Sequence, residues 1–194
     1  MTNVVISDTD IIVHMVKGQV FSKIMPLLID QVYITPKVDE ELRLRHAGVY
    51  GSLTPFFAEG KWLFKLKPMW KDFSSEQKRS INETKDQHRA RLDPGELDCL
   101  AYATGLGIPA IISDDKGAKE IISLVTKNKK VVLTFWDLLV LGAKKDKLSW
   151  SDAKVHYEAV KRACSLKLPD FEFQVRSFED KVQFHPWVQK FLES

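Results

Sequence analysis

The chain has 194 residues, 44% hydrophobic and 28% charged, which suits one globular domain or one domain with an appendage. No apolar run approaches the length of a membrane span, and the N-terminal residues hold no signal pattern, so we expect a cytoplasmic protein with no membrane contact. The two cysteines lie far apart and no Cys/His spacing is typical of a metal site, which favours a reducing compartment. The net charge of +3 is too small by itself to indicate a nucleic-acid partner.

The first elements predicted along the chain are two buried strands joined by a helix. A β-branched run at residues 4–7 predicts a strand buried on both faces, which delivers Asp8 to its carboxyl end. Apolar residues at helical spacing over 21–29 predict a crossover helix, and residues 32–34 predict the second strand. Asp10 follows Asp8 closely, so the end of the first strand has two carboxylates.

A helix should begin at Pro36, because Thr35 is a good N-cap and proline suits the first helical position. Glu41 falls in the second turn of this helix. Its structural role would be a favourable position near the helix N-terminus or an i,i+4 pair with Arg45. A functional role for Glu41 requires that other acids arrive at the same place.

The middle of the chain has weaker patterns. Residues 49–75 mix Gly and Pro with aromatic residues, and one alternating run at 62–66 predicts an edge strand. Residues 76–91 are polar and carry charges of both signs. We expect them to form a solvated helix or a mobile connection that can act as a lip over the acidic edge.

The stretch Asp93-Pro94-Gly95-Glu96 is a strong helix start. Asp93 is a plausible N-cap, Pro94 suits the first helical position, and Glu96 completes an arrangement like a capping box. Asp98 interrupts the small, apolar helix that follows and has no structural role that its neighbours in the sequence reveal. We therefore prefer Asp98 to Glu96 as a residue for chemistry.

A short apolar run at residues 108–113 leads directly into Asp114 and Asp115. It predicts a buried strand whose carboxyl end, where ligands bind in open α/β sheets, holds two acids. The plain structural interpretation is a turn and a helix N-cap, because Asp serves both well. The elements expected next are a helix, a strand and a helix over residues 116–126, 131–134 and 135–143.

The pattern changes near residue 147, where we place a soft boundary between a domain of residues 1–147 and a C-terminal extension of residues 148–194. The extension opens with an amphipathic helix near Ser149 and holds six Phe or Trp residues beyond Pro169. Soluble monomers avoid exposing such a surface, so it must pack on its own domain, on a second copy of the chain or on a partner. We favour its own domain, with dimerisation second, because no flexible linker separates the two parts.

The alternation of strands and helices predicts an α/β fold with a parallel sheet and helices on both faces. Right-handed crossovers bring the carboxyl ends of all strands to one edge, so Asp8 and Asp115 should converge there. Glu41 and Asp98 lie near the starts of helices that face this edge. Carboxylates gathered in this way repel one another unless cations neutralise them, and oxygen ligands suit Mg²⁺ or Mn²⁺.

With these motifs in this order, the chain resembles the PIN-domain ribonucleases. The matching stretches are residues 8–10, 35–42, 95–101 and 111–115, and the resemblance covers roughly residues 3–147. It implies a PIN-like, three-layer α/β/α fold with a five-stranded parallel sheet of order 3-2-1-4-5. It also implies metal-dependent cleavage of single-stranded RNA.

The resemblance places the catalytic acids on Asp8, Glu41, Asp98 and Asp115, with Mg²⁺ or Mn²⁺ held by Asp8, Asp98 and Asp115. Further acids at the same edge are secondary candidates: Asp10, Glu96 and Asp114. A cation held by such acids can activate a water molecule and stabilise charge on the attacked phosphate, so no His, Ser or Cys nucleophile is needed.

Basic residues flank the expected acidic pocket. The stretch from Lys116 to Lys147 holds eight lysines against three acids, which fits a phosphate backbone passing over bound metal, although such runs often mean only a solvated face. The residues expected to contact nucleic acid are Lys17, Arg45, Lys116 and Lys119. The partners expected are single-stranded RNA and, further, an antitoxin protein or a second copy of the chain.

Two other interpretations are open. In the first, the chain is a haloacid-dehalogenase-like phosphatase, because Asp8-Thr9-Asp10 imitates that family's nucleophile pair and residues 111–115 imitate its metal-binding motif. Against it, the helix before the second motif offers Glu96 and Asp98 where that family needs a lysine. In the second, the chain is a PIN-like module that binds RNA or protein without cleaving, and the presence of all four acids argues against this.

Overall fold

A computed structural model describes residues 2–194. Its centre is a five-stranded sheet in the order β3-β2-β1-β4-β5, in which every neighbouring pair of strands is parallel. The strands are β1 (Val4–Ser7), β2 (Gln31–Ile34), β3 (Leu63–Lys65), β4 (Ala110–Ile112) and β5 (Val131–Leu133). The α/β class and the strand order expected from the sequence are therefore confirmed.

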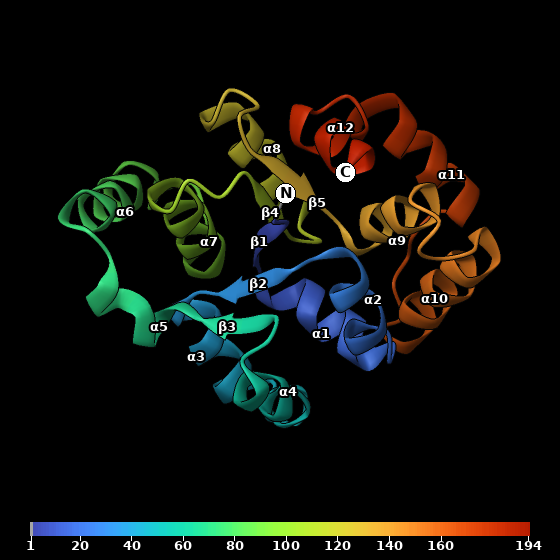
Figure 1. Cartoon of the computed structure of the whole chain (residues 1–194), viewed down its shortest axis with the longest axis horizontal. Coiled ribbons are helices and arrows are strands. Elements are labelled where there is room, and N and C mark those ends of the chain that lie inside the picture. The colour runs from blue at the N-terminus through green and yellow to red at the C-terminus, as the bar shows by residue number, and fades with distance from the viewer. Residues whose placement is uncertain (1) are drawn as a thin grey trace.

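Helices cover both faces of this sheet. The α-helices are α1 (Thr9–Lys17), α2 (Phe21–Leu28), α3 (Pro36–Arg45), α4 (Ala47–Glu59), α5 (Leu66–Met69), α6 (Ser75–His88), α7 (Pro94–Gly105), α8 (Lys116–Val125), α9 (Phe135–Lys144), α10 (Trp150–Ala163), α11 (Phe171–Ser177) and α12 (Pro186–Glu193). Figure 1 shows α6, α7 and α8 on one side of the sheet, and α1, α2 and α9 on the other. This arrangement follows from right-handed crossovers, because the chain steps from β1 to β2 in one direction and from β4 to β5 in the other.

The central strand β1 is the most enclosed part of the sheet. Val5 and Ile6 have no exposed surface, since β2 and β4 flank the strand and helices cover it on both faces. A strand in this position needs apolar side chains in both directions, which is why its sequence does not alternate. Its carboxyl end therefore opens at the middle of the sheet edge, between two neighbouring strands.

One helix differs from the expectation for residues 49–75. The structure places α4 (Ala47–Glu59) where Gly51 and Pro55 interrupt the sequence and no helix was predicted. The helix buries only Val49 and Leu53, so its apolar face is too narrow to give a clear period in the sequence. Tertiary packing of these two residues outweighs the low helix propensity of the glycines.

The C-terminal extension packs on the rest of the chain. Helix α10 contacts α1 and α9, and the Tyr157 ring lies 5.7 Å from the ring of Phe135 in a stacked arrangement. The Nζ atom of Lys145 donates to the carbonyl oxygen of Phe191 at 2.8 Å, which ties α12 to the end of α9. Most of the extension's aromatic side chains are thus covered within one chain, although Trp150, Phe173 and Phe184 are exposed.

No helix among residues 2–194 has both the length and the apolar character needed to cross a membrane.

Candidate functional site

An acidic pocket lies where β1 ends. Asp8 follows the last residue of β1 and stands at the N-cap of α1, and it is only 6% exposed. The backbone N–H of Asp8 donates to the carbonyl oxygen of Ile112 at 3.0 Å, which fixes the chain against the end of β4. The hydroxyl of Ser113 donates to Asp8 Oδ2 at 3.1 Å. Asp8 is therefore a buried carboxylate with a defined orientation, in the crevice where α/β folds bind ligands.

Glu41 reaches the same pocket from α3. Its Oε2 atom accepts a hydrogen bond from Thr9 Oγ1 at 2.9 Å, and its Oε1 atom pairs with Arg45 Nη1 at 2.8 Å. The i,i+4 pair with Arg45 expected from the sequence is therefore present. The contact with Thr9 also joins the second turn of α3 to the first turn of α1, so that Glu41 is held beside Asp8.

Gly95 lies beside the carboxylates of both Asp8 and Glu41 in the pocket. A Cβ atom on Gly95 would lie 3.4 Å from Asp8 Oδ1 and 3.5 Å from Glu41 Oε2. Two carboxylate oxygens from different elements thus approach one point beside the first turn of α7. The pocket has a volume of about 380 Å³, and its acidic lining includes Asp8, Asp10, Glu41 and Glu96.

The carboxylates in this pocket repel one another. The pKa of Asp8 is raised to about 7, chiefly by burial and also by the nearby carboxylates of Asp10 and Glu96, while the hydrogen bonds from Thr9 and Ser113 lower it. Burial also raises the pKa of Glu96, with a smaller contribution from the charge of Asp115. A cation in the pocket would relieve both effects, because it stabilises the ionised carboxylates.

Glu96 and Asp98 have different surroundings from those expected. Glu96 forms the expected capping box, in which its Oε2 accepts from the backbone N–H of Asp93 at 3.1 Å, and it also lines the acidic pocket. Asp98 pairs with Lys85 Nζ at 2.5 Å and accepts from the backbone N–H of Lys37 at 3.1 Å. The expectation that Asp98 has no structural role is wrong, because it joins α6, α7 and the first turn of α3.

The two acids that follow β4, Asp114 and Asp115, differ in exposure and in hydrogen-bond partners. Asp115 is exposed and caps α8, since its Oδ1 accepts from the backbone N–H of Ala118 at 2.7 Å. The side chain of Asp114 is only 6% exposed, lies 2.7 Å from His14 Nδ1, and accepts from the backbone N–H of Phe135 at 2.9 Å. Asp114 therefore joins α1 to the start of α9. Asp115, which was expected to converge with Asp8, does not line the acidic pocket, although its charge acts on Glu96.

A metal ion fits the chemistry of this donor set. Among residues 2–194, no three Asp, Glu, His or Cys side chains form a ready metal-binding group. The oxygens of Asp8 and Glu41 nevertheless face a common point that Gly95 leaves free, with Glu96 lining the same pocket. Carboxylate oxygens are the ligands that Mg²⁺ and Mn²⁺ prefer, and Mg²⁺ retains several waters when few protein ligands are available.

The four basic residues expected to contact nucleic acid have different positions. Arg45 lines the acidic pocket. Lys116 and Lys119 line a groove of about 930 Å³ beside α8 and α11 that also includes Asp115, and Lys119 pairs with Asp137 at 3.4 Å. Lys17 lies in the last turn of α1, at the opposite end of the helix from Asp8, and does not line the acidic pocket.

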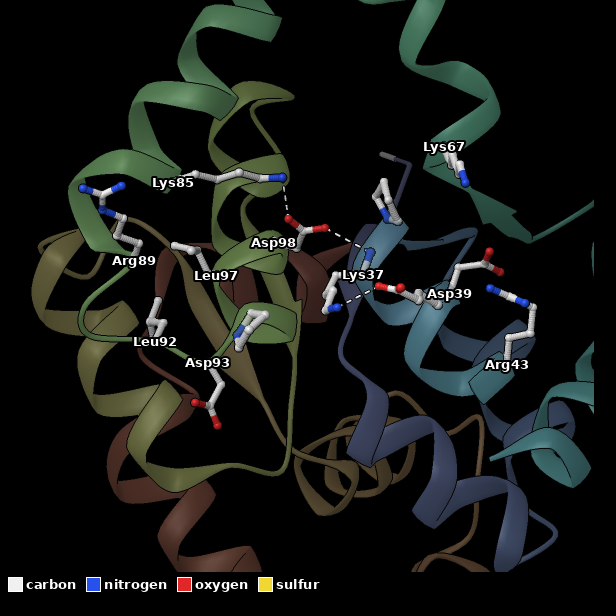
Figure 2. Close-up of a pocket in the computed structure, with 13 residues that line it drawn as sticks. Lys37, Asp39, Arg43, Lys67, Lys85, Arg89, Leu92, Asp93, Leu97 and Asp98 are labelled. Atoms are coloured by element: carbon white, nitrogen blue, oxygen red, sulfur yellow. Dashed lines mark hydrogen bonds and ion pairs between the residues drawn. The ribbon is translucent and has the colours of Figure 1, made fainter. Parts of the chain in front are cut away.

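A second pocket, of about 780 Å³, was not expected from the sequence. Figure 2 shows it between α6 and α7 on one side and α3 on the other, with Lys67 nearby. We call it the basic pocket, because it is lined by five cationic side chains, those of Lys37, Arg43, Lys67, Lys85 and Arg89. These residues come from three separated segments, so no local motif could have revealed their convergence.

No protein-family model, curated protein or solved structure matches this chain. The resemblance to PIN-domain ribonucleases therefore remains an expectation from the sequence motifs alone.

Proposed function

We propose that this chain is a PIN-like nuclease that uses Mg²⁺ or Mn²⁺ to hydrolyse phosphodiester bonds of single-stranded RNA. The observation that supports this most directly is the approach of Asp8 Oδ1 and Glu41 Oε2 to one point beside Gly95, at the carboxyl edge of the sheet. Buried carboxylates without nearby cations are costly, and a divalent cation bound to a phosphate removes that cost.

The residues that would hold the ion are Asp8 and Glu41, with Glu96 in the same pocket. A divalent ion bound by these residues would activate a water molecule for attack on phosphorus and stabilise the developing charge. The chain's own groups prepare this arrangement: Ser113 orients Asp8, and Thr9 orients Glu41. Arg45, 74% exposed at the rim, is placed to contact a phosphate oxygen.

Asp98 has a different role in this proposal. Both of its oxygens already have partners, Lys85 and the backbone of Lys37, and it lines the basic pocket instead of the acidic one. We therefore assign the third acid to Glu96, although the family resemblance places it on Asp98. Glu96 can do this while its other oxygen retains the capping bond, because a carboxylate has two oxygens.

The experiment is to incubate the purified full chain with mixed single-stranded RNA in the presence of Mn²⁺ or of EDTA, and to identify the product ends. We expect cleavage with Mn²⁺ and none with EDTA. Asp8→Asn should abolish cleavage and leave the fold intact, because it removes charge without changing shape. Equal cleavage in EDTA, or full activity of the variant, would overturn the proposal. Hydrolysis of a generic aryl phosphate in place of RNA would indicate a phosphatase.

A further inference from the structure

The basic pocket adjoins the acidic pocket. Both pockets are lined by Lys37, Glu40, Asp93 and Pro94, so they share a wall built from the first turns of α3 and α7. A chain molecule bound over the acidic pocket can therefore continue into the basic one. The two pockets differ in charge balance: six carboxylates and two cations line the acidic pocket, whereas five cations and four carboxylates line the basic pocket.

The basic pocket is lined by five cationic side chains and by four carboxylates, those of Asp39, Glu40, Asp93 and Asp98. Lys37 pairs with Glu40 at 2.7 Å, and Lys85 pairs with Asp98. Within residues 2–194, Arg43, Lys67 and Arg89 have no ion-pair partner. Cations that line one concave surface repel each other, and an anion with several oxygens would relieve this repulsion.

The walls also offer apolar surface. Leu92, Leu97, Pro36 and Pro94 line the pocket among the charges, and Figure 2 shows Leu92 and Leu97 on the wall that carries Arg89. A pocket that combines cations with apolar patches suits a nucleotide, in which a charged phosphate is joined to a flat base.

We propose that the basic pocket binds the nucleotide next to the scissile phosphate of a single-stranded RNA. Arg43, Lys67 and Arg89 hold its phosphate, and the leucines and prolines contact its base or ribose. The ligand class rests on the proposed function, since RNA is the substrate named there. Asp98 supports this pocket by holding Lys85 on its wall at a fixed position.

The test measures binding without cleavage. Wild-type protein in EDTA is titrated into a fluorescently labelled single-stranded oligoribonucleotide, and anisotropy is recorded over a range of salt concentrations. The variants are Arg43→Gln, Lys67→Gln and Arg89→Gln. The matched controls are Arg79→Gln, an exposed arginine on the helix that ends at Arg89, and Lys61→Gln, an exposed lysine near Lys67 in the chain.

We expect each pocket variant to bind RNA about 3-fold to 10-fold more weakly at low salt, and the controls to bind as the wild type does. The slope of log affinity against log salt should fall by about 0.7 for each phosphate that a variant no longer neutralises. Thermal melts should be the same for variants and controls, because all five side chains are exposed.

The test distinguishes failure of the pocket assignment from failure of the proposed nuclease activity. If pocket variants and controls have the same affinity and salt slope, the pocket does not bind RNA, even where wild-type protein cleaves RNA with Mn²⁺. If the pocket variants alone weaken binding but no cleavage occurs with Mn²⁺, the pocket assignment holds and the proposed nuclease activity is wrong.

Discussion

Asp8 is the residue on which the acidic pocket depends. It is buried, it follows the central strand, and its neighbours include the carboxylates of Glu41 and Glu96. In the absence of a cation, the neutral form of Asp8 is favoured up to neutral pH, because burial raises its pKa to about 7. On the proposed function, a proton and a metal ion would therefore compete for the same oxygens.

This competition predicts how stability depends on pH. The pKa of Asp8 is about 7 in the folded chain, against an ordinary value of 3.8 that applies to the unfolded chain, so folding favours the protonated form. The contribution of Asp8 to stability is fully present below the unfolded pKa and is lost as pH rises through the folded pKa. Without metal, we expect Asp8 to make the free energy of unfolding about 2–3 kcal/mol lower at pH 7.5 than at pH 5.

Urea unfolding at the two pH values, with EDTA or Mn²⁺, measures this effect. Asp8→Asn should show a smaller pH dependence by that amount, whereas Asp86→Asn, an exposed carboxylate on α6 outside the acidic pocket, should remain close to the wild type. Mn²⁺ should stabilise the wild type more at the higher pH, because it binds the ionised carboxylate. A wild-type pH profile that matches Asp8→Asn would show that Asp8 is not perturbed.

The roles of Glu96 and Asp98 can be distinguished by the different effects of substituting each residue. Asp98→Asn weakens the pair with Lys85, so we expect a loss of stability of about 1–3 kcal/mol with metal affinity retained. Glu96→Gln keeps a capping-box residue and should lower Mn²⁺ affinity and cleavage with little loss of stability. Lys85→Met should resemble Asp98→Asn in stability. Loss of cleavage and of metal affinity in Asp98→Asn alone would return the third acid to Asp98.

The sequence predicts residues whose partners lie close along the chain. The Glu41–Arg45 pair and the capping box of Glu96 depend on spacings of four and three residues, and both are present. The partner of Asp98 could not be found in this way. Lys85 lies on a polar helix with no strong period, and only the packing of α6 against α7 brings the two side chains together.

At the scale of elements, the close packing of α6 on α7 shapes the wall of the basic pocket. Gly105 permits this approach, because a Cβ atom there would lie 2.4 Å from Ile81 Cγ1 and 2.9 Å from the carbonyl oxygen of Gln77. Two of the pocket's cations, Lys85 and Arg89, are positioned by α6 and its end. The separation of the two helices is therefore set by a residue without a side chain.

Gly105→Ala should destabilise the protein by about 1–3 kcal/mol, because overpacking against backbone outweighs the better helix propensity of alanine. The matched control is Gly51→Ala in α4, where a Cβ atom meets nothing within 4 Å. We expect that control to stabilise by about 0.5–1 kcal/mol. Urea unfolding checks both, and equal effects in the same direction would show that α6 and α7 can move apart freely.

The order of strands and helices could be predicted from the sequence, because each element depends on a short, continuous stretch of residues. Apolar strands at residues 4–7 and 110–112 alternate with helical patterns, and handedness then fixes where each strand lies. Helix α4 could not be predicted from the sequence. Its buried face consists only of Val49 and Leu53, and its glycines and Pro55 are not typical of a helix. The basic pocket was hidden for a related reason: its walls meet only in the folded chain.

At the scale of the whole molecule, residues 150–193 complete the layer formed by α1 and α9. A Cβ atom on Gly18 would lie 2.5 Å from Val160 Cγ2 and 2.9 Å from Val160 Cα, so the chain after α1 and helix α10 are in very close contact. Tyr157 is fully buried and its hydroxyl donates to the carbonyl oxygen of Pro169 at 2.7 Å. The extension is therefore joined to the sheet-bearing part by backbone contacts and by a shared apolar core.

Truncation after Lys147 should then give a protein that aggregates or fails to fold. The deletion would uncover Phe135, which stacks on Tyr157, together with the α9 surface beneath α10 and α11. Removing one buried aromatic side chain costs about 3–5 kcal/mol, and the deletion removes several, against a total stability of about 5–15 kcal/mol. Size-exclusion chromatography and near-UV circular dichroism of the truncated and full chains measure the outcome.

Lys190→Gln on the exposed face of α12 is the control for a mild change in the extension and should behave as the wild type. A monomeric, folded truncation that still cleaves RNA would show that the extension is a separable arm, whose apolar face serves a partner instead of its own core.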